Sequence, residues 1–228
     1  MTKRLYIVAE GQTERDFIKN MLRPFFAARG IYDVHPRLIH TSKLGRGGHS
    51  NIEHLLNTIK PLLANKHAED LLVTTFVDFY KFPTNLPNYE KYIALPDHES
   101  AADAMQQELS SIIQDRRFLP YIQLHEFETL LFSSPKGFSA LFEDDDTSVK
   151  NLTHIVQSFA NPEEINNTPE GAPSKRILKQ RPTYDKVLEG NLIAEEIGIE
   201  QILERCPRFA SWISRLTAMC KPSASANE

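Results

Sequence analysis

Two acidic residues of this sequence lie where buried strands are expected to end. Glu10 follows the apolar run 5–9, and Asp78 follows the run 71–77, which has the strongest buried-strand pattern in the chain. A carboxylate at the end of a buried strand needs a charged or hydrogen-bonding partner. We therefore expect both residues to belong to a catalytic site, Glu10 as a metal ligand or acid/base group and Asp78 as a metal ligand.

A His-Glu-Phe-Glu string at 125–128 follows a shorter apolar run and supplies two further acids. We expect Glu126 and Glu128 to be further metal ligands, and His125 to orient a carboxylate or a water molecule. A structural alternative stays open, in which the acids stabilise a helix N-terminus and His125 satisfies a buried hydrogen bond. A zinc-protease helix is excluded, because the His-Glu-x-x-His pattern would need histidine where the sequence has Thr129.

Acids gathered from separate strand ends repel one another and raise one another's pKa unless a cation lies between them. Oxygen ligands of this kind favour Mg²⁺ or Mn²⁺ over zinc. These ions promote phosphodiester cleavage by polarising the phosphoryl oxygen, lowering the pKa of water and stabilising the leaving oxygen. The pattern therefore indicates metal-dependent chemistry on phosphodiesters, for which no Ser, Cys or His nucleophile is required.

Two basic segments are candidates for contacting phosphate groups. Arg46 lies in a Gly-Arg-Gly-Gly loop ahead of a helix, and five basic residues lie in the segment 173–186. We expect Arg46, Lys175 and Arg176 to bind substrate. The alternatives are a flexible surface loop and a solvated helix face, and the loop lacks the Gly-Lys-Ser/Thr ending of a nucleotide P-loop.

The elements that must position these residues alternate between strands and helices. Strands are expected at 5–9, 32–41, 71–77 and 121–124, and helices at 13–29, 50–64 and 98–115. The alternation predicts an α/β fold with a mainly parallel sheet of about four strands and helices on both faces. In such a sheet, ligand sites lie outside the carboxyl ends of the strands, where the acids fall.

Local signals indicate where the first two helices begin and end. Thr13 is expected to be the N-cap of the first helix, and Ser50 that of the second. Pro24 is expected to kink the first helix, and Gly30 to end it. Acids in a first helical turn are favoured by the helix dipole, so we expect structural roles for the two found there. They are Glu14 and Asp16.

The alternating pattern stops after position 132. We expect an α/β domain at 1–135, a helical lid or subdomain at 136–220 and a disordered tail at 221–228. The chain has 228 residues, of which 41% are hydrophobic, so it can bury one substantial core.

The composition limits the class of protein. A formal charge of -4 excludes a protein that binds nucleic acid with its whole surface, so any polyanion contact must come from local basic patches or metal. Two cysteines are too few for a disulfide framework or a thiolate zinc site. No apolar run approaches the roughly 20 residues of a membrane span. We therefore expect a cytoplasmic protein without membrane association.

The string Glu-Gly-Gln-Thr-Glu at 10–14, after the first hydrophobic strand, resembles the opening motif of the Toprim family. In that family the glutamate acts in metal binding or acid/base catalysis, which the resemblance implies for Glu10. The second Toprim motif, Asp-x-Asp, is half matched, since Asp78 is kept and Tyr80 stands in place of the second aspartate. The resemblance thus implies that one metal ligand comes from elsewhere, or that a single metal is bound weakly.

A closer resemblance is to a bacterial family of unknown function (domain of unknown function 4276), which is grouped with Toprim-like proteins and is distantly related to the Toprim nucleases of OLD and RloB type. The similar segments are 10–14, 78–80 with Pro83, 123–128 and 173–176, and the His-Glu-Phe-Glu string is the most specific of them. The resemblance covers the chain from about 5 to 186. It implies a Toprim-like fold.

The same resemblance implies a nuclease or phosphodiesterase that uses Mg²⁺ or Mn²⁺ and acts on DNA or RNA. It also implies a role in bacterial phage defence beside a separate ATPase partner, and it leaves formation of a homo-oligomer open. One alternative is a catalytically inactive Toprim-like binding or regulatory module that lost the second aspartate. Another is a small-molecule phosphotransfer enzyme whose pocket is closed by the loop 80–96.

Overall fold

A computed structural model describes residues 2–39, 51–65, 68–142, 146–165 and 171–221. Arg46, expected to bind phosphate, lies outside the described residues. The strands are β1 (Arg4–Ala9), β2 (Val34–Leu38), β3 (Leu71–Asp78), β4 (Phe118–Leu119) and β5 (Ile122–Gln123). The helices up to the last strand are α1 (Gln12–Phe17), the π-helix η1 (Ile18–Leu22), α2 (Arg23–Ala27), α3 (Ile52–Leu63), α4 (Tyr89–Ile93) and α5 (His98–Ile113).

The remaining elements are all helical. They are the 3-10 helix η2 (Phe127–Ser133), α6 (Lys136–Leu141), α7 (Asp146–Ser158), the 3-10 helix η3 (Pro162–Glu164), α8 (Pro173–Gln180), α9 (Leu188–Ile197), α10 (Ile199–Arg205) and α11 (Pro207–Cys220). No helix in the described part of the chain is long and apolar enough to cross a membrane.

The sheet has the strand order β2-β1-β3-β4, with β5 also paired to β3, and every strand pair is parallel. This confirms the expected α/β fold with a mainly parallel sheet flanked by helices, an architecture consistent with a Toprim-like fold. Because the strands are parallel, the ends of β1, β3 and β5 face the same edge of the sheet. Glu10 and Asp78 therefore lie at one edge.

The expected fourth strand at 121–124 is divided differently in the structure. Two short strands, β4 and β5, flank Pro120 and Tyr121 instead. Pro120 has no N–H to donate to a ladder. The hydroxyl of Thr75 accepts a hydrogen bond from the backbone N of Tyr121 at 2.8 Å and donates to its carbonyl oxygen at 2.7 Å. A side chain of β3 thus replaces the backbone pairing at this point.

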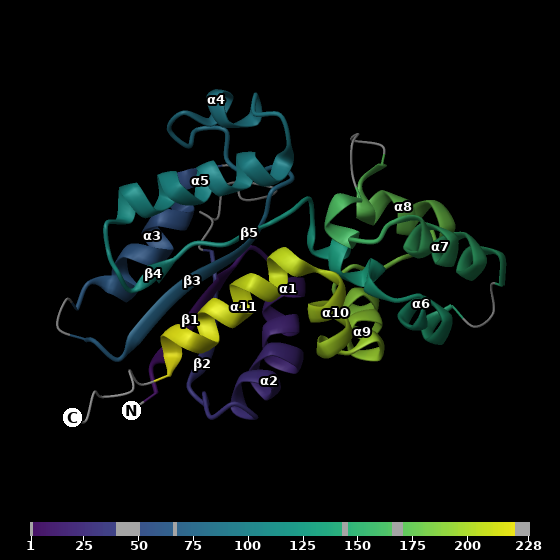
Figure 1. Ribbon diagram of the computed structural model, residues 1–228, viewed down its shortest axis with the longest axis horizontal. Helices are drawn as coiled ribbons and strands as arrows, with labels where there is room; N and C mark the ends of the chain where they lie inside the picture. Colours follow the sequence, from purple (N-terminus) through teal and green to yellow (C-terminus); the bar gives the residue numbers. More distant parts are fainter. Residues whose placement is uncertain (1, 40–50, 66–67, 143–145, 166–170, 222–228) are drawn as a thin grey trace.

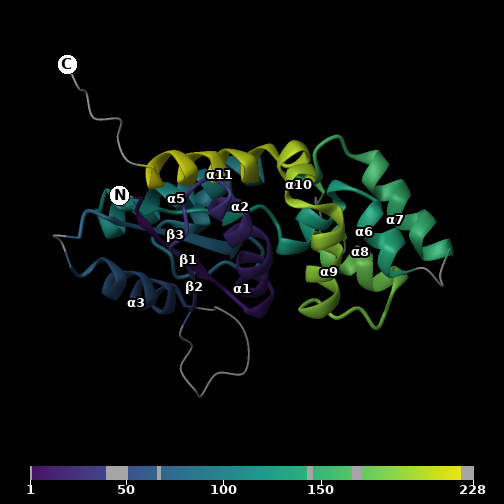
Figure 2. The same ribbon diagram turned by 90° about the horizontal axis from the view of Figure 1, so that it is seen from below.

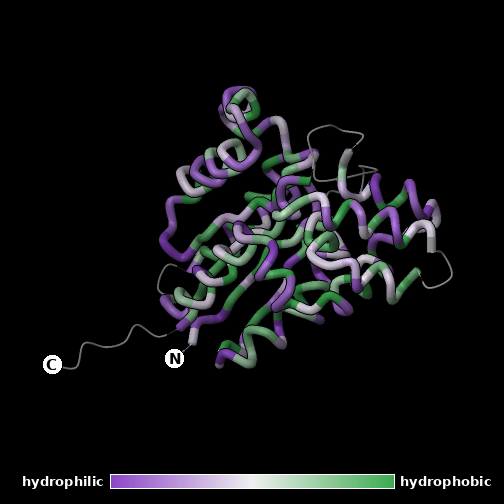
Figure 3. The backbone as a smooth tube through the Cα atoms, turned by 45° about the vertical axis from the view of Figure 1, so that its right-hand side comes forward, coloured by the Kyte–Doolittle hydropathy of each residue, from purple (hydrophilic) through white to green (hydrophobic). Residues whose placement is uncertain are grey.

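Alternate residues of the central strands face opposite sides of the sheet, as strand geometry requires. Phe76 of β3 belongs to the buried cluster beneath α1, α2 and α11, whereas Val73 and Val77 belong to the cluster beneath α3 and α5. Figure 2 shows α3 and α11 on opposite sides of the sheet. The most hydrophobic stretches of the backbone trace lie mainly in the interior (Figure 3). The sheet is therefore covered on both faces.

The first helical segment differs from expectation at its start. Gly11, not Thr13, is the N-cap of α1, and Glu14 Oε2 accepts a hydrogen bond from the backbone N of Gly11 at 2.9 Å. Pro24 follows the wide π-helical turn of η1, which accommodates a residue that cannot donate a helical hydrogen bond. Gly30 ends the segment with a φ of 83°, as expected.

Helix α3 is capped one residue later than expected. The side chain of Asn51 accepts a hydrogen bond from the backbone N of Glu53 at 2.8 Å, and Ser50, the expected N-cap, lies outside the described residues.

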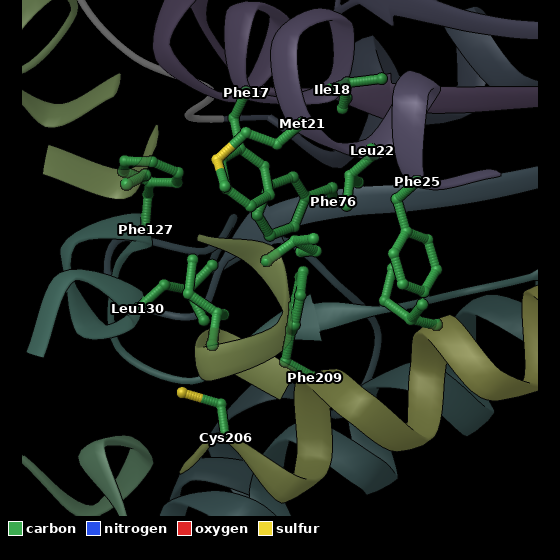
Figure 4. Close-up of a cluster of buried hydrophobic side chains, with 14 of the residues drawn as sticks. Phe17, Ile18, Met21, Leu22, Phe25, Phe76, Phe127, Leu130, Cys206 and Phe209 are labelled. Carbon is green, nitrogen blue, oxygen red and sulfur yellow. The ribbon is translucent and has the colours of Figure 1, made fainter. Parts of the chain in front are cut away.

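The later helices form two groups. Helices α6 to α10 lie together beside the carboxyl edge of the sheet, whereas α11 returns across the sheet (Figure 1). Trp212 of α11 donates a hydrogen bond to the hydroxyl of Thr74 in β3 at 2.9 Å. One buried cluster continues from the sheet into these helices (Figure 4), and it includes Phe17, Phe127 and Phe209. The division of the chain near residue 135 stays a prediction.

Candidate active site

Four carboxylates from four elements meet at the carboxyl edge of the sheet, and one ammonium group joins them. The acids are Glu10 after β1, Glu14 in α1, Asp78 at the end of β3, and Glu128 in η2. Lys186, in the turn before α9, lies among them. Its Nζ is 3.1 Å from Glu128 Oε2, 3.6 Å from Asp78 Oδ2 and 3.8 Å from Glu14 Oε1.

Lys186 covers the acids on their solvent side. Its side chain is 38% exposed, whereas those of Glu14, Asp78 and Glu128 are 4%, 11% and 0% exposed. The Lys186 side chain is therefore more exposed than those of the three acids that it contacts. A flexible four-carbon stem in a turn allows the head group to move away without unfolding any helix.

Burial, together with neighbouring acids, raises the pKa of three carboxyl groups of this cluster. Burial and the nearby charge of Glu14 raise the pKa of Glu10 to about 7. Burial likewise raises the pKa of Asp78 well above its ordinary value, and Glu14, Glu10 and Glu128 add to that increase. Burial also raises the pKa of Glu128. A divalent cation in place of the Lys186 ammonium would therefore stabilise the charged forms of these acids.

Lys186 remains charged in this setting. Burial alone would lower its pKa, but the charges of Asp78, Glu128 and Glu14 raise it far above the ordinary value for lysine. The cluster thus contains one ammonium group that stays protonated and partly offsets the negative charge of the four acids.

Buried polar atoms without hydrogen-bond partners gather at this place. Seven such side-chain atoms occur in the described part of the chain, and five of them lie at or beside the cluster. They are Asp78 Oδ1, both carboxylate oxygens of Glu128, the hydroxyl of Tyr184 and Asn191 Oδ1, of which Glu128 Oε2 still has the ion pair with Lys186 at 3.1 Å. Buried polar groups are normally satisfied, so their concentration here indicates a place built for a polar ligand.

The donor set fits a hard divalent cation, although the side chains do not yet surround a common point. Across the described ranges, no three Asp, Glu, His or Cys side chains are arranged to hold a metal ion. The ammonium of Lys186 lies between Glu14, Asp78 and Glu128, where such an ion would be bound. All four acids offer oxygen ligands, and oxygens of Asp78 and Glu128 lack partners. Binding would require Lys186 to withdraw.

Glu14 belongs to the site, although sequence reasoning gave it only a structural role. One of its oxygens caps α1 at Gly11, and the other faces Lys186. The signal that could have found it is spacing: Glu10 ends a strand and Glu14 lies one helical turn beyond it. Asp16 behaves as expected, because it forms an ion pair with the neighbouring Arg15 at 2.8 Å.

Glu126 is held by a helix rather than by the cluster. Its Oε2 accepts a hydrogen bond from the backbone N of Ser174 in the first turn of α8 at 3.0 Å. A carboxylate at this position also interacts favourably with the helix dipole. Its charge still acts on Glu128, whose pKa it helps to raise. The observed contact matches the structural alternative for Glu126.

His125 lies away from the carboxylates. Its Nε2 is 3.1 Å from the backbone oxygen of Glu163, and its ring contacts that of His98 edge-on, with 5.2 Å between the ring centroids. Its backbone has a φ of 63°, which directs the ring into a separate hollow of about 430 Å³. Burial and His98 lower its pKa to about 4, so it is neutral at pH 7.

The basic residues expected to contact phosphate lie on α8, which packs against η2 through the Ser174–Glu126 contact. Lys175 is exposed. The guanidinium of Arg176 donates a hydrogen bond to the carbonyl of Gly171 at 2.7 Å, and it lies over the ring of Phe159. Arg176 is therefore engaged within the fold, whereas Lys175 faces solvent.

Tyr80 stands where the resemblance to the Toprim motif led us to expect a second aspartate. Its backbone N donates a hydrogen bond to the carbonyl of His125 at 2.8 Å, which joins the ends of β3 and β5. Its ring lies near the ammonium of Lys81, at 5.2 Å from the ring centroid. The missing acid is thus replaced by an aromatic residue, while Glu14 and Glu128 bring the number of clustered carboxylates to four.

Comparisons with known proteins place the sequence in a family. The family model described as a domain of unknown function (DUF4276) matches residues 9–217. No curated protein matches the sequence.

Two solved proteins are similar to the chain over nearly its whole length. The C-terminal region of the Burkholderia pseudomallei OLD protein is 15% identical, with a TM-score of 0.46, over 95% of this chain and 100% of that chain. The C-terminal region of the Xanthomonas campestris pv. campestris OLD protein is 12% identical, with a TM-score of 0.40, over 93% of this chain and 97% of that chain.

Proposed function

Because the chain belongs to a family described as a domain of unknown function (DUF4276), we propose its function from the site itself: it is a divalent-metal-dependent nuclease that cleaves phosphodiester bonds in nucleic acid. The observation that carries the proposal is that Glu14, Asp78 and Glu128 all lie within 3.1–3.8 Å of one ammonium group, that of Lys186, while Glu10 interacts electrostatically with Glu14 and Lys186. A purely structural ion pair would need one acid, not four.

The four carboxylates would hold Mg²⁺ or Mn²⁺, and the bound ion would polarise the phosphoryl oxygen and lower the pKa of water. Glu10 is the least buried acid of the group and has a pKa near 7. In the metal-free protein it can therefore exchange a proton near neutral pH, whereas a bound divalent cation would lower this pKa and keep the carboxylate charged as a ligand. Lys186, displaced toward solvent, would be placed to contact a phosphate oxygen of the substrate.

Nucleic acid is the substrate class that α8 favours. The helix joins the site segment through Ser174 and Glu126, and it carries the exposed Lys175 and Lys179. Local basic residues of this kind bind a phosphate backbone in a salt-dependent manner. Since the net charge of the chain is -4, this patch would direct a polyanion toward one part of the surface.

The test is cleavage of single-stranded and double-stranded DNA and RNA in the presence of Mn²⁺ or Mg²⁺. Wild-type protein should cut at least one of these polymers, chelation should stop the reaction, and Asp78→Asn and Glu128→Gln should each lower the rate by about 100-fold or more. Even outer hydrogen-bond partners of metal ligands are worth about 10- to 100-fold. Glu90→Gln, at an exposed acid on α4, serves as the matched control and should cut normally.

Absence of cleavage of all four polymers with either ion, by protein that is folded, would refute the nuclease proposal. Cleavage of mononucleotides in preference to polymers would point instead to small-molecule phosphotransfer. A polymer substrate should also show a steep decline of the rate with added salt.

The second candidate is a noncatalytic binding or regulatory module. The position of Lys186 favours it, because an ammonium within 3.1–3.8 Å of three acids resembles a completed ion-pair group. Mn²⁺ titration separates the two candidates, since a nuclease site must bind the ion whereas a completed ion-pair group has no need of one.

Within these 228 residues there is no Gly-Lys-Ser/Thr nucleotide loop. We therefore propose that any ATP-driven step is supplied by a separate ATPase partner, in keeping with a role in phage defence. Co-purification of such a partner with a tagged form of this chain would test it.

A further inference from the structure

Tyr184 has a buried hydroxyl group for which the described chain supplies no hydrogen-bond partner. The residue is 8% exposed and lies two positions before Lys186. Leaving a buried hydroxyl unpaired costs about 1–3 kcal/mol. Such a group is retained where a bound ligand or a rearranged side chain supplies the partner.

The surroundings of this hydroxyl connect it to the carboxylate cluster. Among the charged groups that act on Tyr184, Glu128 has the strongest influence, followed by Lys186. Glu128 Oε1 also lacks a hydrogen-bond partner, whereas Oε2 lies 3.1 Å from the Lys186 ammonium. The Tyr184 hydroxyl is a buried donor without a partner, and the Glu128 carboxylate is a buried acceptor that interacts with it electrostatically. The two groups are suited to form a hydrogen bond once the site rearranges.

Gly190 makes room for the hydroxyl. A Cβ atom added at Gly190 would lie 2.8 Å from the Tyr184 hydroxyl, which is closer than real Cβ contacts allow. Glycine within a helix costs about 1 kcal/mol relative to alanine, and Gly190 is the third residue of α9. The helix thus carries a residue that weakens it at the point where the hydroxyl lies.

We propose that Tyr184 is a positioning residue for Glu128: when a divalent cation displaces Lys186, the Tyr184 hydroxyl donates a hydrogen bond to the Glu128 carboxylate and fixes it as a metal ligand. The inference rests on the proposed metal site. Burial keeps the phenol protonated, because it raises the pKa of Tyr184 well above its ordinary value. The Tyr184 hydroxyl is therefore neutral and able to donate a hydrogen bond at neutral pH.

The experiment is Mn²⁺ titration by calorimetry of wild type, Tyr184→Phe and the control Tyr92→Phe, with thermal unfolding measured without metal. Tyr184→Phe should weaken Mn²⁺ binding about 10- to 100-fold. It should leave the metal-free melting temperature unchanged or higher, because it removes an unsatisfied buried group without changing the shape. Tyr92, whose hydroxyl donates to Glu108 at 2.5 Å, should show the reverse: unchanged Mn²⁺ binding and no gain in stability.

A second variant moves the hydroxyl without deleting it. Gly190→Ala favours the helix but pushes the Tyr184 hydroxyl aside, so it should also weaken Mn²⁺ binding. The double variant Tyr184→Phe/Gly190→Ala should be no weaker than Tyr184→Phe alone, since both changes act on one hydrogen bond.

The outcomes separate this inference from the nuclease proposal. Wild-type Mn²⁺ affinity in Tyr184→Phe would overturn the role of Tyr184 and leave the nuclease proposal standing. Weakened binding in Tyr184→Phe together with absence of cleavage by wild type would uphold the role of Tyr184 and refute the nuclease. Absence of Mn²⁺ binding by wild type would refute both.

Discussion

At the scale of single residues, the acids at the carboxyl edge lower the stability of the metal-free fold, and the same acids are the proposed metal ligands. Asp78 shows this most clearly, since burial and three neighbouring acids all raise its pKa, and its Oδ1 has no hydrogen-bond partner. A group in this position destabilises the metal-free fold in its charged form. Selection for stability alone would not keep this buried charge, so its presence favours a role in binding.

Asp78→Asn should therefore stabilise the metal-free protein. Removal of one buried negative charge is expected to gain on the order of 1 kcal/mol, which corresponds to about 2–4 °C in melting temperature for a chain of this length. The same variant should lose the increase in melting temperature that Mn²⁺ gives to wild type. Differential scanning calorimetry with and without Mn²⁺ measures both effects, and a less stable metal-free variant would contradict the account.

Lys186 should behave in the opposite way. Lys186→Met removes the one cation of the group, so the metal-free protein should lose about 1–3 kcal/mol, a range kept low because the side chain is partly exposed. Mn²⁺ binding should become tighter, since the ion no longer competes with the ammonium. The control Lys136→Met removes an exposed ion pair with Glu196 and should change neither quantity. Weaker Mn²⁺ binding by Lys186→Met would show that the ammonium does not occupy the ion's place.

At the scale of elements, α11 is anchored to the rest of the fold at its N-terminus. The carboxylate of Glu163, in η3, accepts hydrogen bonds from the backbone N of Arg208 at 2.8 Å and of Phe209 at 3.0 Å. These are N–H groups that the helix cannot satisfy internally. The pKa of Glu163 is nevertheless about 7, because its burial outweighs the two hydrogen bonds.

Glu163 should make the stability of the protein depend on pH. A carboxyl group whose pKa is raised by folding from 4.5 to about 7 contributes stability that is present below pH 4.5 and is lost as pH rises toward 7. The full effect is on the order of 3 kcal/mol. Glu163→Gln should therefore show a smaller decline in unfolding free energy over this range than wild type does. Glu164→Gln, at an exposed neighbour, is the control, and equal slopes in both variants would refute the role of Glu163.

The elements themselves were largely predictable from the sequence. The apolar run 71–77 predicted β3 because a short continuous apolar run of this length is typical of a buried strand. Gly30 ended the first helical segment as expected. The start of α1 was misplaced because Thr13 and Gly11 are both acceptable caps, and only the contact with Glu14 distinguishes them. A two-residue strand such as β4 leaves no periodic pattern to read.

The site was predictable only in part, for a physical reason. Strand ends identified Glu10, Asp78 and Glu128, because sheet topology brings such ends together. Lys186 was grouped with the other basic residues of its segment, since local sequence cannot show that a turn will direct it inward. His125 and Glu126 were placed with the acids, but His125 contacts the carbonyl of Glu163 and Glu126 accepts a hydrogen bond from Ser174, and local sequence does not show either of these distant partners.

At the scale of the whole molecule, the helices that follow the sheet are part of its core. Phe209 and Trp212 contact Phe76 of β3, with 6.0 and 5.4 Å between the ring centroids. The turn before α9 supplies Lys186 to acids held by the sheet. Core and site are therefore both assembled from segments far apart in the sequence.

A fragment containing residues 1–135 should consequently not fold by itself, even though it contains every strand. It would expose the face of the sheet that α11 covers, and it would leave the acids without Lys186. We expect a fragment with weak near-ultraviolet circular dichroism and strong binding of a hydrophobic dye. A sharp cooperative melting transition of the fragment would show instead that the boundary near 135 separates independent domains.

The position of Lys186 beside the acids also has a consequence for the protein when metal ions are scarce. A pocket that depended on dissolved metal alone to neutralise its carboxylates would loosen whenever the supply fell. On the metal site proposed above, the flexible Lys186 side chain would be a removable counter-ion, and an arriving ion would replace the ammonium without any change of the backbone.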